Sequence, residues 1–244
     1  MENPEIWIRT ICRKNGRSVD DQALSLLSTY TGLLLEWNQK INLISRKDEN
    51  NVWENHILHS ISMLFKVQLA EGSRVLDLGT GGGLPGIPLS ILCPSLSFTL
   101  LDATQKKVKA VKDMVGRLGI RNVDTSWGRA EDLAGNSMFQ KKFDYVVARA
   151  VAPLRDLVRW SAPLLSPGGS QPHSWSNRSG PEASPIIPPA LIALKGGLLE
   201  KEMRELERGS KNVSVRVHDL VFDGSEHVLA SDKKIVIVNL TKGA

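Results

Sequence analysis

Two spacings of apolar residues divide the chain. In the first 70 residues, apolar positions recur every three or four residues at about 20–41 and again at 51–65, which predicts two amphipathic helices. A capping-box pattern from Ser18 to Asp21 predicts the start of the first helix. From residue 71 onward, short apolar runs alternate with helical patterns, and this order predicts a parallel sheet with right-handed crossovers. The runs expected to form strands are 75–78, 98–102, 122–133, 143–154, 191–195, 214–222 and 234–240.

The stretch 75–88 joins one of these strands to a glycine-rich turn and the start of a helix. Four glycines, at positions 79, 81, 82 and 83, follow the apolar run directly. Pro85 and Pro88 fit only the first turn of a helix, where a missing N–H costs nothing. A helix N-terminus offers free N–H groups and a positive dipole, and glycines let a ligand approach the backbone. The stretch therefore predicts a nucleotide-type site at the carboxyl end of a parallel strand.

Two ligand classes compete for this site. The spacing Gly81-x-Gly83-x-x-Gly86 matches the dinucleotide fingerprint by letter. However, Asp77 lies in the strand itself, and Asp-x-Gly-x-Gly-x-Gly resembles the first motif of class I S-adenosylmethionine (SAM) methyltransferases. Asp102 ends the next apolar run, where an acid meets ribose hydroxyls in such folds. The pattern favours SAM, with S-adenosylhomocysteine as product, over a dinucleotide or a merely structural turn.

Charged residues gather at the same predicted edge of the sheet. Arg149 ends the run that begins at residue 143, which places it beside the ligand in any doubly wound sheet. A structural arginine there would need a buried carboxylate, so a functional role is favoured. Four lysines, at 106, 107, 109 and 112, lie on the helix expected between Thr104 and Gly119. They form either a solvated face or part of the ligand mouth.

The N-terminal region contributes polar candidates of its own. The loop 42–50 carries Arg46 and Lys47 and is a candidate for substrate contact. His56, His59 and Ser60 share one side of the second helical pattern, where surface or helix-cap roles are expected. Neither histidine has a carboxylate or cysteine at metal-ligand spacing, so no metal site is expected.

Composition narrows the class of protein only slightly. The chain has 244 residues, a formal net charge of +5 and two cysteines without metal or disulfide spacing. A reducing cytoplasm is the expected location, since no apolar run suits a membrane span and the first residues do not form a signal peptide. The positive charge mildly favours a polyanionic partner.

Residues 170–190 interrupt the α/β pattern. They contain prolines at 172, 181, 185, 188 and 189, together with several serines and glycines, which predicts a mobile insertion. The expected organisation is a helical extension at 1–70 and a ligand-binding α/β domain at 71–244.

Taken together, these segments resemble the bacterial small-subunit rRNA guanine-N7 methyltransferases, the glucose-inhibited division protein B family. The resemblance covers roughly residues 30–240, and GTGGGLPGIP with LKGG in register is its most specific part. It implies a Rossmann-like class I SAM methyltransferase fold, α/β, with a seven-stranded, mostly parallel sheet, helices on both faces and an antiparallel hairpin at one edge. It also implies methylation of N7 of guanine 527 in 16S rRNA, with the small ribosomal subunit as partner. The motifs are WNQKINLIS (37–45), HILHS (56–60), LDLGTGGGLPGIPL (76–89), LLDATQKKV (100–108), GRAEDL (128–133), ARAVAPL (148–154) and LKGG (194–197).

The resemblance also implies roles for individual residues. Cofactor binding is implied for Asp77, Gly79, Thr80, Gly81, Gly83, Leu84, Asp102, Ala103, Ala130, Glu131 and Arg149. Catalytic roles are implied for Arg149, Lys195 and Arg129, and RNA contacts for Asn42, Arg46, His56, Ser60 and Lys233. A monomer without a metal is expected. The sequence departs from the family in the insertion after PGG, and in Lys233 or Lys234 standing where an arginine is frequent.

The expected chemistry needs little acid–base help. Guanine N7 has a lone pair and no proton to lose, so alignment and exclusion of water matter more than a general base. The sequence after the fourth strand reads Ala-Arg-Ala, not the Asp/Asn-Pro-Pro motif of enzymes acting on exocyclic amines. Two alternatives stay open: a small-molecule SAM methyltransferase, and an rRNA-binding assembly factor with an idle SAM site.

Overall fold

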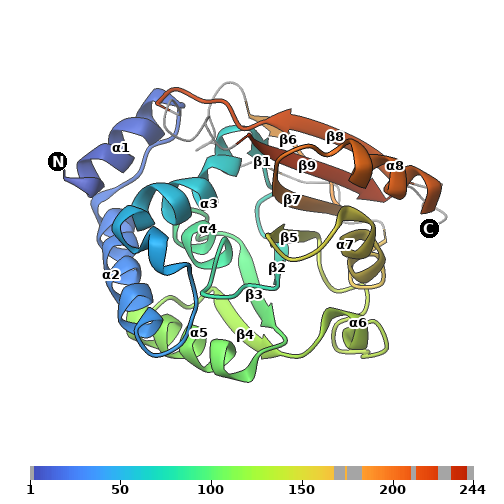
Figure 1. Cartoon of the computed structure of the whole chain (residues 1–244), viewed down its shortest axis with the longest axis horizontal. Coiled ribbons are helices and arrows are strands. Elements are labelled where there is room, and N and C mark those ends of the chain that lie inside the picture. Colours follow the sequence, from blue (N-terminus) through green and yellow to red (C-terminus); the bar gives the residue numbers. More distant parts are fainter. Residues whose placement is uncertain (1–2, 168–173, 175–182, 210–212, 225–231, 241–244) are drawn as a thin grey trace.

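A seven-stranded sheet forms the centre of the molecule in the computed structural model, which describes residues 3–167, 174, 183–209, 213–224 and 232–240 (Figure 1). The strand order is β4-β3-β2-β5-β7-β9-β8, and only β9 runs antiparallel to its neighbours. The predicted class I methyltransferase sheet with an antiparallel edge is thereby confirmed. The strands are β2 (Arg74–Leu78), β3 (Ser97–Asp102), β4 (Val123–Trp127), β5 (Tyr145–Arg149), β7 (Ala190–Gly196), β8 (Val213–Asp219) and β9 (Lys233–Leu240).

Helices cover both faces of this sheet. Alternate residues of each central strand enter two separate cores, so that Val75 and Val147 face one layer while Leu76 and Val146 face the other. This two-sided burial explains why the strands read as nearly continuous apolar runs. The first layer contains α1 (Pro4–Lys14), α2 (Asp21–Asn38), α3 (His59–Ile61), α4 (Gly86–Leu92) and α5 (Gln105–Leu118), and the second contains α6 (Ala130–Leu133), α7 (Leu154–Ser161) and α8 (Glu200–Gly209).

The N-terminal helices differ from the prediction in two details. Helix α2 is capped by Asp20, whose carboxylate accepts a hydrogen bond from the N–H of Ala23, so the predicted cap at Ser18 is wrong. The helical run predicted at 51–65 is confirmed in extent, but it is not one regular α-helix. A 3₁₀ turn, η1 (Arg46–Asn51), leads into a π-helical turn, η2 (Trp53–Leu58), then the short α3, and a second 3₁₀ turn, η3 (Ser62–Phe65), follows.

The N-terminal segment and the sheet share one core. Apolar side chains of α1 and α2, including Ile8 and Leu27, pack in the same cluster as Val75 of β2 and Ile237 of β9. The division at residue 70 stays a prediction. The helices of the described residues include none that is long and apolar enough to cross a membrane.

The predicted insertion is described only in part. Residues 168–173 and 175–182 lie outside the described residues, so the prediction of a mobile loop is untested there. The end of the segment forms strand β6 (Ser184–Pro185), which pairs with β1 (Val67–Gln68). Ile186 follows and is fully buried, and its carbonyl accepts a 2.5 Å hydrogen bond from the Tyr145 hydroxyl. This end of the segment therefore packs against the main core.

Candidate functional site

The glycine-rich turn connects the end of β2 to the start of α4, as the sequence predicts. Gly79 and Gly81 have φ values of +74° and +59°, a left-handed conformation that other residues rarely adopt. A Cβ at Gly86 would lie 2.3 Å from Leu100 Cδ2 and 2.6 Å from Asp77 Oδ2. Glycine at position 86 thus lets the helix approach the sheet closely, whereas glycines 79 and 81 shape the turn.

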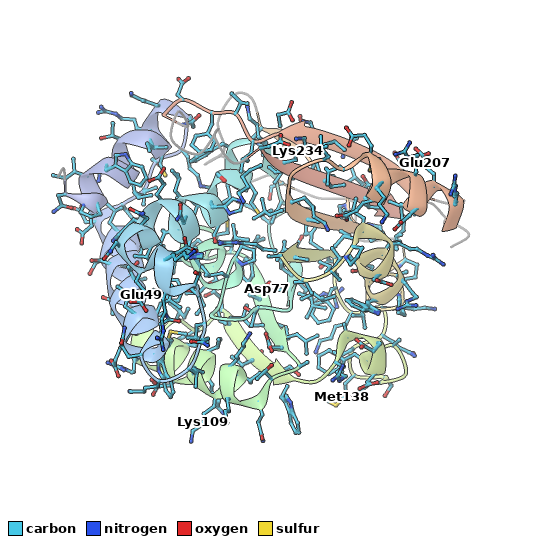
Figure 2. The ribbon with its side chains drawn as sticks, in the orientation of Figure 1. Glu49, Asp77, Lys109, Met138, Glu207 and Lys234 are labelled. Carbon is cyan, nitrogen blue, oxygen red and sulfur yellow. The ribbon has the colours of Figure 1, made fainter. Side chains whose placement is uncertain are left out.

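Asp77 lies in the centre of the molecule, under this turn (Figure 2). Its Oδ2 accepts hydrogen bonds from Thr80 Oγ1 at 2.6 Å and from the N–H of Gly86 at 2.9 Å. Oδ1 is buried and finds no hydrogen-bond partner among the described residues. Burial raises the pKa of the carboxyl to about 7. A cationic ligand such as SAM fits this buried, partly unpaired carboxylate.

Asp102 ties the neighbouring strand end to the same turn. Its Oδ2 accepts from the N–H of Gly81 at 2.9 Å, and its Oδ1 accepts from the N–H of Thr104 at 2.7 Å. Thr104 is the N-cap position of α5, as predicted, although its own side chain makes no capping bond. The carboxyl ends of β2 and β3 therefore form one continuous edge.

The remaining cofactor candidates extend along this edge. Ala103 is exposed after β3, and its carbonyl accepts a hydrogen bond from Trp127 Nε1 at the end of β4. Ala130 is buried at the start of α6, where the exposed Glu131 lies 3.8 Å from Arg129. Thr80 and Leu84 are buried within the glycine-rich turn. The structure thus gathers the predicted cofactor residues along three adjacent strand ends.

Arg149 is held by the N-terminal segment. Its Nη1 donates to the carbonyl of His56 at 3.2 Å and to Ser60 Oγ at 3.1 Å. Its Nη2 donates to the carbonyl of Asn55 at 3.0 Å and lies 2.6 Å from His56 Nδ1. The expectation that a structural arginine here needs a buried carboxylate is wrong, because neutral acceptors bind this guanidinium directly. Burial lowers its pKa to about 10.

Both histidines of the segment are buried, so the surface or cap roles expected for them are wrong. His56 and His59 are each 7% exposed, and Ser60 is fully buried. His56 Nε2 lies 3.3 Å from Asp48 Oδ2, which leaves Nδ1 as the acceptor that faces Arg149. Burial, with the charge of Arg149, lowers the pKa of His56 to about 4, so this imidazole is neutral at physiological pH.

A cavity of about 500 Å³ opens beside these groups, at the carboxyl ends of β5 and β7. Among the predicted residues it contains Arg149, Lys195, His56 and Lys233. Arg129, Asn42 and Arg46 do not line it, and all three are exposed. Lys109, from the lysine-rich helix α5, lies at the periphery of the molecule (Figure 2). The complete lining is Asp48, Asn55, His56, His59, Arg149, Ala150, Leu194, Lys195, Gly196, Glu202 and Lys233.

The sequence of this chain is similar to those of a known protein family. The profile of the family described as rRNA small subunit methyltransferase G matches residues 23–173. The chain is 39% identical to the ribosomal RNA small subunit methyltransferase G of Chlorobium luteolum, over 94% of this chain and 87% of that protein. The chain belongs to the rRNA small subunit methyltransferase G family.

Other comparisons agree with this assignment. The protein of the same name from Chlorobaculum tepidum is 42% identical over 84% of this chain and 83% of its own length. The likenesses to solved structures are more distant. M. jannaschii TYW2 in complex with AdoMet has a TM-score of 0.51 at 12% identity, covering 76% of this chain and 74% of that chain. The [4+2]-cyclase SpnF has a TM-score of 0.54 at 15% identity, covering 77% and 81%. These structures show the fold alone, because a cyclase shares it.

One residue of this family member that sequence reasoning missed is Tyr30 in α2. Its hydroxyl donates to the carbonyl of Gly82 at 2.9 Å, within the glycine-rich turn. A Cβ at Gly82 would lie 2.8 Å from Leu34 Cδ1, so α2 packs directly against the turn. The apolar spacing identified Tyr30 only as a core position, and no local motif signals its contact with a residue 52 positions away.

We expect Tyr30→Phe to lower both stability and SAM affinity. The buried carbonyl of Gly82 loses its donor, which costs about 1–3 kcal/mol of unfolding free energy. A looser turn should weaken SAM binding by about 3- to 10-fold, as measured by urea unfolding and calorimetric titration.

Tyr145→Phe is the matched control for this change. The Tyr145 hydroxyl is also buried and hydrogen-bonded, to Ala70 and Ile186, but not to the turn. It should lower stability and leave SAM affinity unchanged. Equal SAM affinities in the two variants would contradict a role for Tyr30 in holding the turn.

Proposed function

We propose that this protein transfers the methyl group of SAM to N7 of guanine 527 in the 16S rRNA of the small ribosomal subunit. The observation that carries the proposal is the cavity at the carboxyl ends of β5 and β7, where Arg149 is fixed at the end of β5. Family membership supports rRNA of the small subunit as the substrate. We extend the proposal to a monomer that acts in the cytoplasm.

SAM supplies the methyl group as a sulfonium electrophile and becomes S-adenosylhomocysteine. In this proposal the methionine end is held at the turn by Asp77, Gly79, Gly81 and Gly83, with Thr80 and Leu84 beside them. Asp102 and Ala103 bind at the ribose, and Ala130 and Glu131 flank the adenine. Support comes from the buried Asp77 Oδ1, which lacks a partner in the described part of the chain. The intact left-handed turn adds to this support.

The reaction requires alignment more than proton transfer. Guanine N7 presents its lone pair in the plane of the ring and has no proton to remove. Four close contacts fix the Arg149 guanidinium, so it can orient the base or an adjacent phosphate without reorganising. His56 is neutral and already engaged with both Asp48 and Arg149, so it serves to position Arg149.

The proposed RNA contacts lie around the mouth of the cavity and beyond it. Lys233 lines the cavity, while Arg46 and Asn42 are exposed on the N-terminal segment. Lysine and arginine neutralise phosphates at such positions, and the net charge of +5 favours this encounter. Arg129, the N-cap residue of α6, is exposed and is proposed to contact RNA or the cofactor from outside the cavity.

Transfer of label to ribosomal particles tests the proposal. The protein is incubated with methyl-labelled SAM and small subunits from a strain that lacks this modification, and cleavage specific for 7-methylguanine maps the product. Label at one guanine of 16S rRNA is the expected result. Small subunits that already carry the methyl group are the control and should take up none. Tight SAM binding without labelled RNA would contradict the proposal and favour a small-molecule substrate or an assembly factor.

A further inference from the structure

We propose that the Lys195–Glu202 pair reads O6 and N1–H of the acceptor base and thereby selects guanine over adenine. The inference rests on the proposed function and concerns the same cavity. Lys195 belongs to the LKGG motif and is the last residue but one of β7. Glu202 comes from α8 and belongs to none of the motifs that carry the family resemblance.

The pair is fixed in place by the surrounding backbone. Lys195 Nζ donates to Glu202 Oε2 at 2.7 Å and to the carbonyl of Ala152 at 2.8 Å. Glu202 Oε2 also accepts from the N–H of Leu154 at 2.8 Å. The two side chains are 13% and 27% exposed, and both residues line the cavity. Their charged atoms therefore face the cavity with restricted freedom.

A count of hydrogen-bonding groups shows what the pair still offers. An ammonium has three N–H donors, and two of those on Lys195 are used. Both interactions of the Glu202 carboxylate go to Oε2, and no described residue bonds to Oε1. The pair consequently presents one donor next to one acceptor.

This pair of one donor and one acceptor is complementary to O6 and N1–H of guanine. Guanine has an acceptor at O6 next to a donor at N1–H, while adenine has a donor at N6 next to an acceptor at N1. A base taken out of its stack is read through these edge groups. With O6 and N1–H held by the pair, N7 remains unobstructed on the other side of O6.

The carboxylate also suits the charge that develops during the reaction. Alkylation at N7 makes the purine ring positive and its N1–H more acidic. A carboxylate that accepts from N1–H therefore binds the transition state more strongly than the unmodified base. Glu202 should for this reason contribute to kcat as well as to base selection, and Lys195 should hold Glu202 in position.

His59 gives independent support for a hydrogen-bonding ligand in this cavity. Its ring donates to the carbonyl of Asn55, and Nε2 is buried without a partner among the described residues. Burial lowers the pKa of His59 well below its usual range, so Nε2 is a lone-pair acceptor. Guanosine can supply the missing donor from its N2 amino group or from a ribose hydroxyl.

The first test compares Glu202→Gln with Glu207→Gln on the same helix. Glu207 is exposed near the edge of the molecule (Figure 2) and does not line the cavity. Glu202→Gln keeps an oxygen for Lys195 but turns the free acceptor into a donor. We expect kcat for methylation of 16S rRNA to fall about 10- to 100-fold, with KM for the particle changed less and SAM affinity unchanged. Preference for guanine over adenine at the target should fall by a similar factor.

The second test uses the unmodified protein, so it does not depend on the variant folding. Small-subunit RNA is prepared with guanine, inosine or 1-methylguanine at the target position. Inosine keeps O6 and N1–H and should be methylated, whereas 1-methylguanine lacks N1–H and should not. Methylation of the guanine and 1-methylguanine RNAs at equal rates would overturn the inference, as would wild-type kcat and base preference in Glu202→Gln. Failure to methylate the guanine RNA would instead refute the proposed function.

Discussion

Replacing Arg149 by alanine should abolish methyl transfer, with kcat falling about 10³-fold, while SAM affinity stays within a factor of about three. The guanidinium is at the end of β5, and Arg149 lines the proposed acceptor cavity. Its loss removes a fixed positive group from the reacting edge and admits water. Single-turnover transfer from labelled SAM to small subunits measures the first effect, and calorimetry measures the second.

Stability must be measured with the same variant. Without Arg149, an oxygen of the buried His56 and one of the buried Ser60 lose a donor, at a total cost of about 1–3 kcal/mol, whereas Asn55 is exposed and its carbonyl can bond to water. Arg149→Lys keeps the charge but cannot donate to all these acceptors, so it should recover stability more than activity. Arg121→Ala, an exposed arginine just before β4, is the control and should behave like the wild type. Wild-type turnover in Arg149→Ala would remove this residue from the mechanism.

Replacing Asp77 by asparagine should weaken SAM binding about 100-fold and change how stability depends on pH. The carboxyl has a pKa of about 7 in the folded protein against 3.8 for the unperturbed group. Between these values the unfolded chain releases a proton that the folded chain retains, so stability falls as pH rises. Asparagine has no such titration.

Thermal unfolding of the protein without SAM measures this difference. The melting temperature of Asp77→Asn relative to wild type should rise by about 10 °C between pH 4 and pH 8. The new amide nitrogen of Asn at position 77 lacks an acceptor among the described residues. The melting temperature of the variant therefore need not exceed that of the wild type at either pH. Asp124→Asn, which removes an exposed carboxylate on β4, should show a constant difference. A constant difference for Asp77→Asn would mean that burial does not perturb this carboxyl.

The sheet and the glycine-rich turn were predictable because their signals are local. Apolar runs mark the strands, and Asp77 and Asp102 fall at strand ends that a parallel sheet must bring together. Tyr30, Asp48 and Glu202 were not predictable in the same way, since each acts through a residue that only tertiary packing brings near. The hydrogen bond from Tyr30 to Gly82 is one example.

The segment 46–65 shows what the spacing of apolar residues could not predict about the cavity. Its apolar residues Trp53, Ile57 and Ile61 follow α-helical spacing, which led to one regular helix. The π-helical turn at 53–58 instead leaves backbone carbonyls at Asn55 and His56 that bind Arg149. His56, within this turn, and His59, directly after it, are buried rather than exposed to solvent. A long-range arginine contact thus outweighed local spacing.

The hydrogen bonds that Tyr30 donates to Gly82 and Arg149 donates to Ser60 also limit how this chain can recombine with a relative. A crossover near residue 70 separates both partners of both contacts. A chimaera joined there would take Tyr30 and Ser60 from one parent. It would take Gly82 and Arg149 from the other. In this protein the N-terminal helices therefore help to build both the cofactor turn and the arginine site, and exchanging them for those of another parent should disturb both.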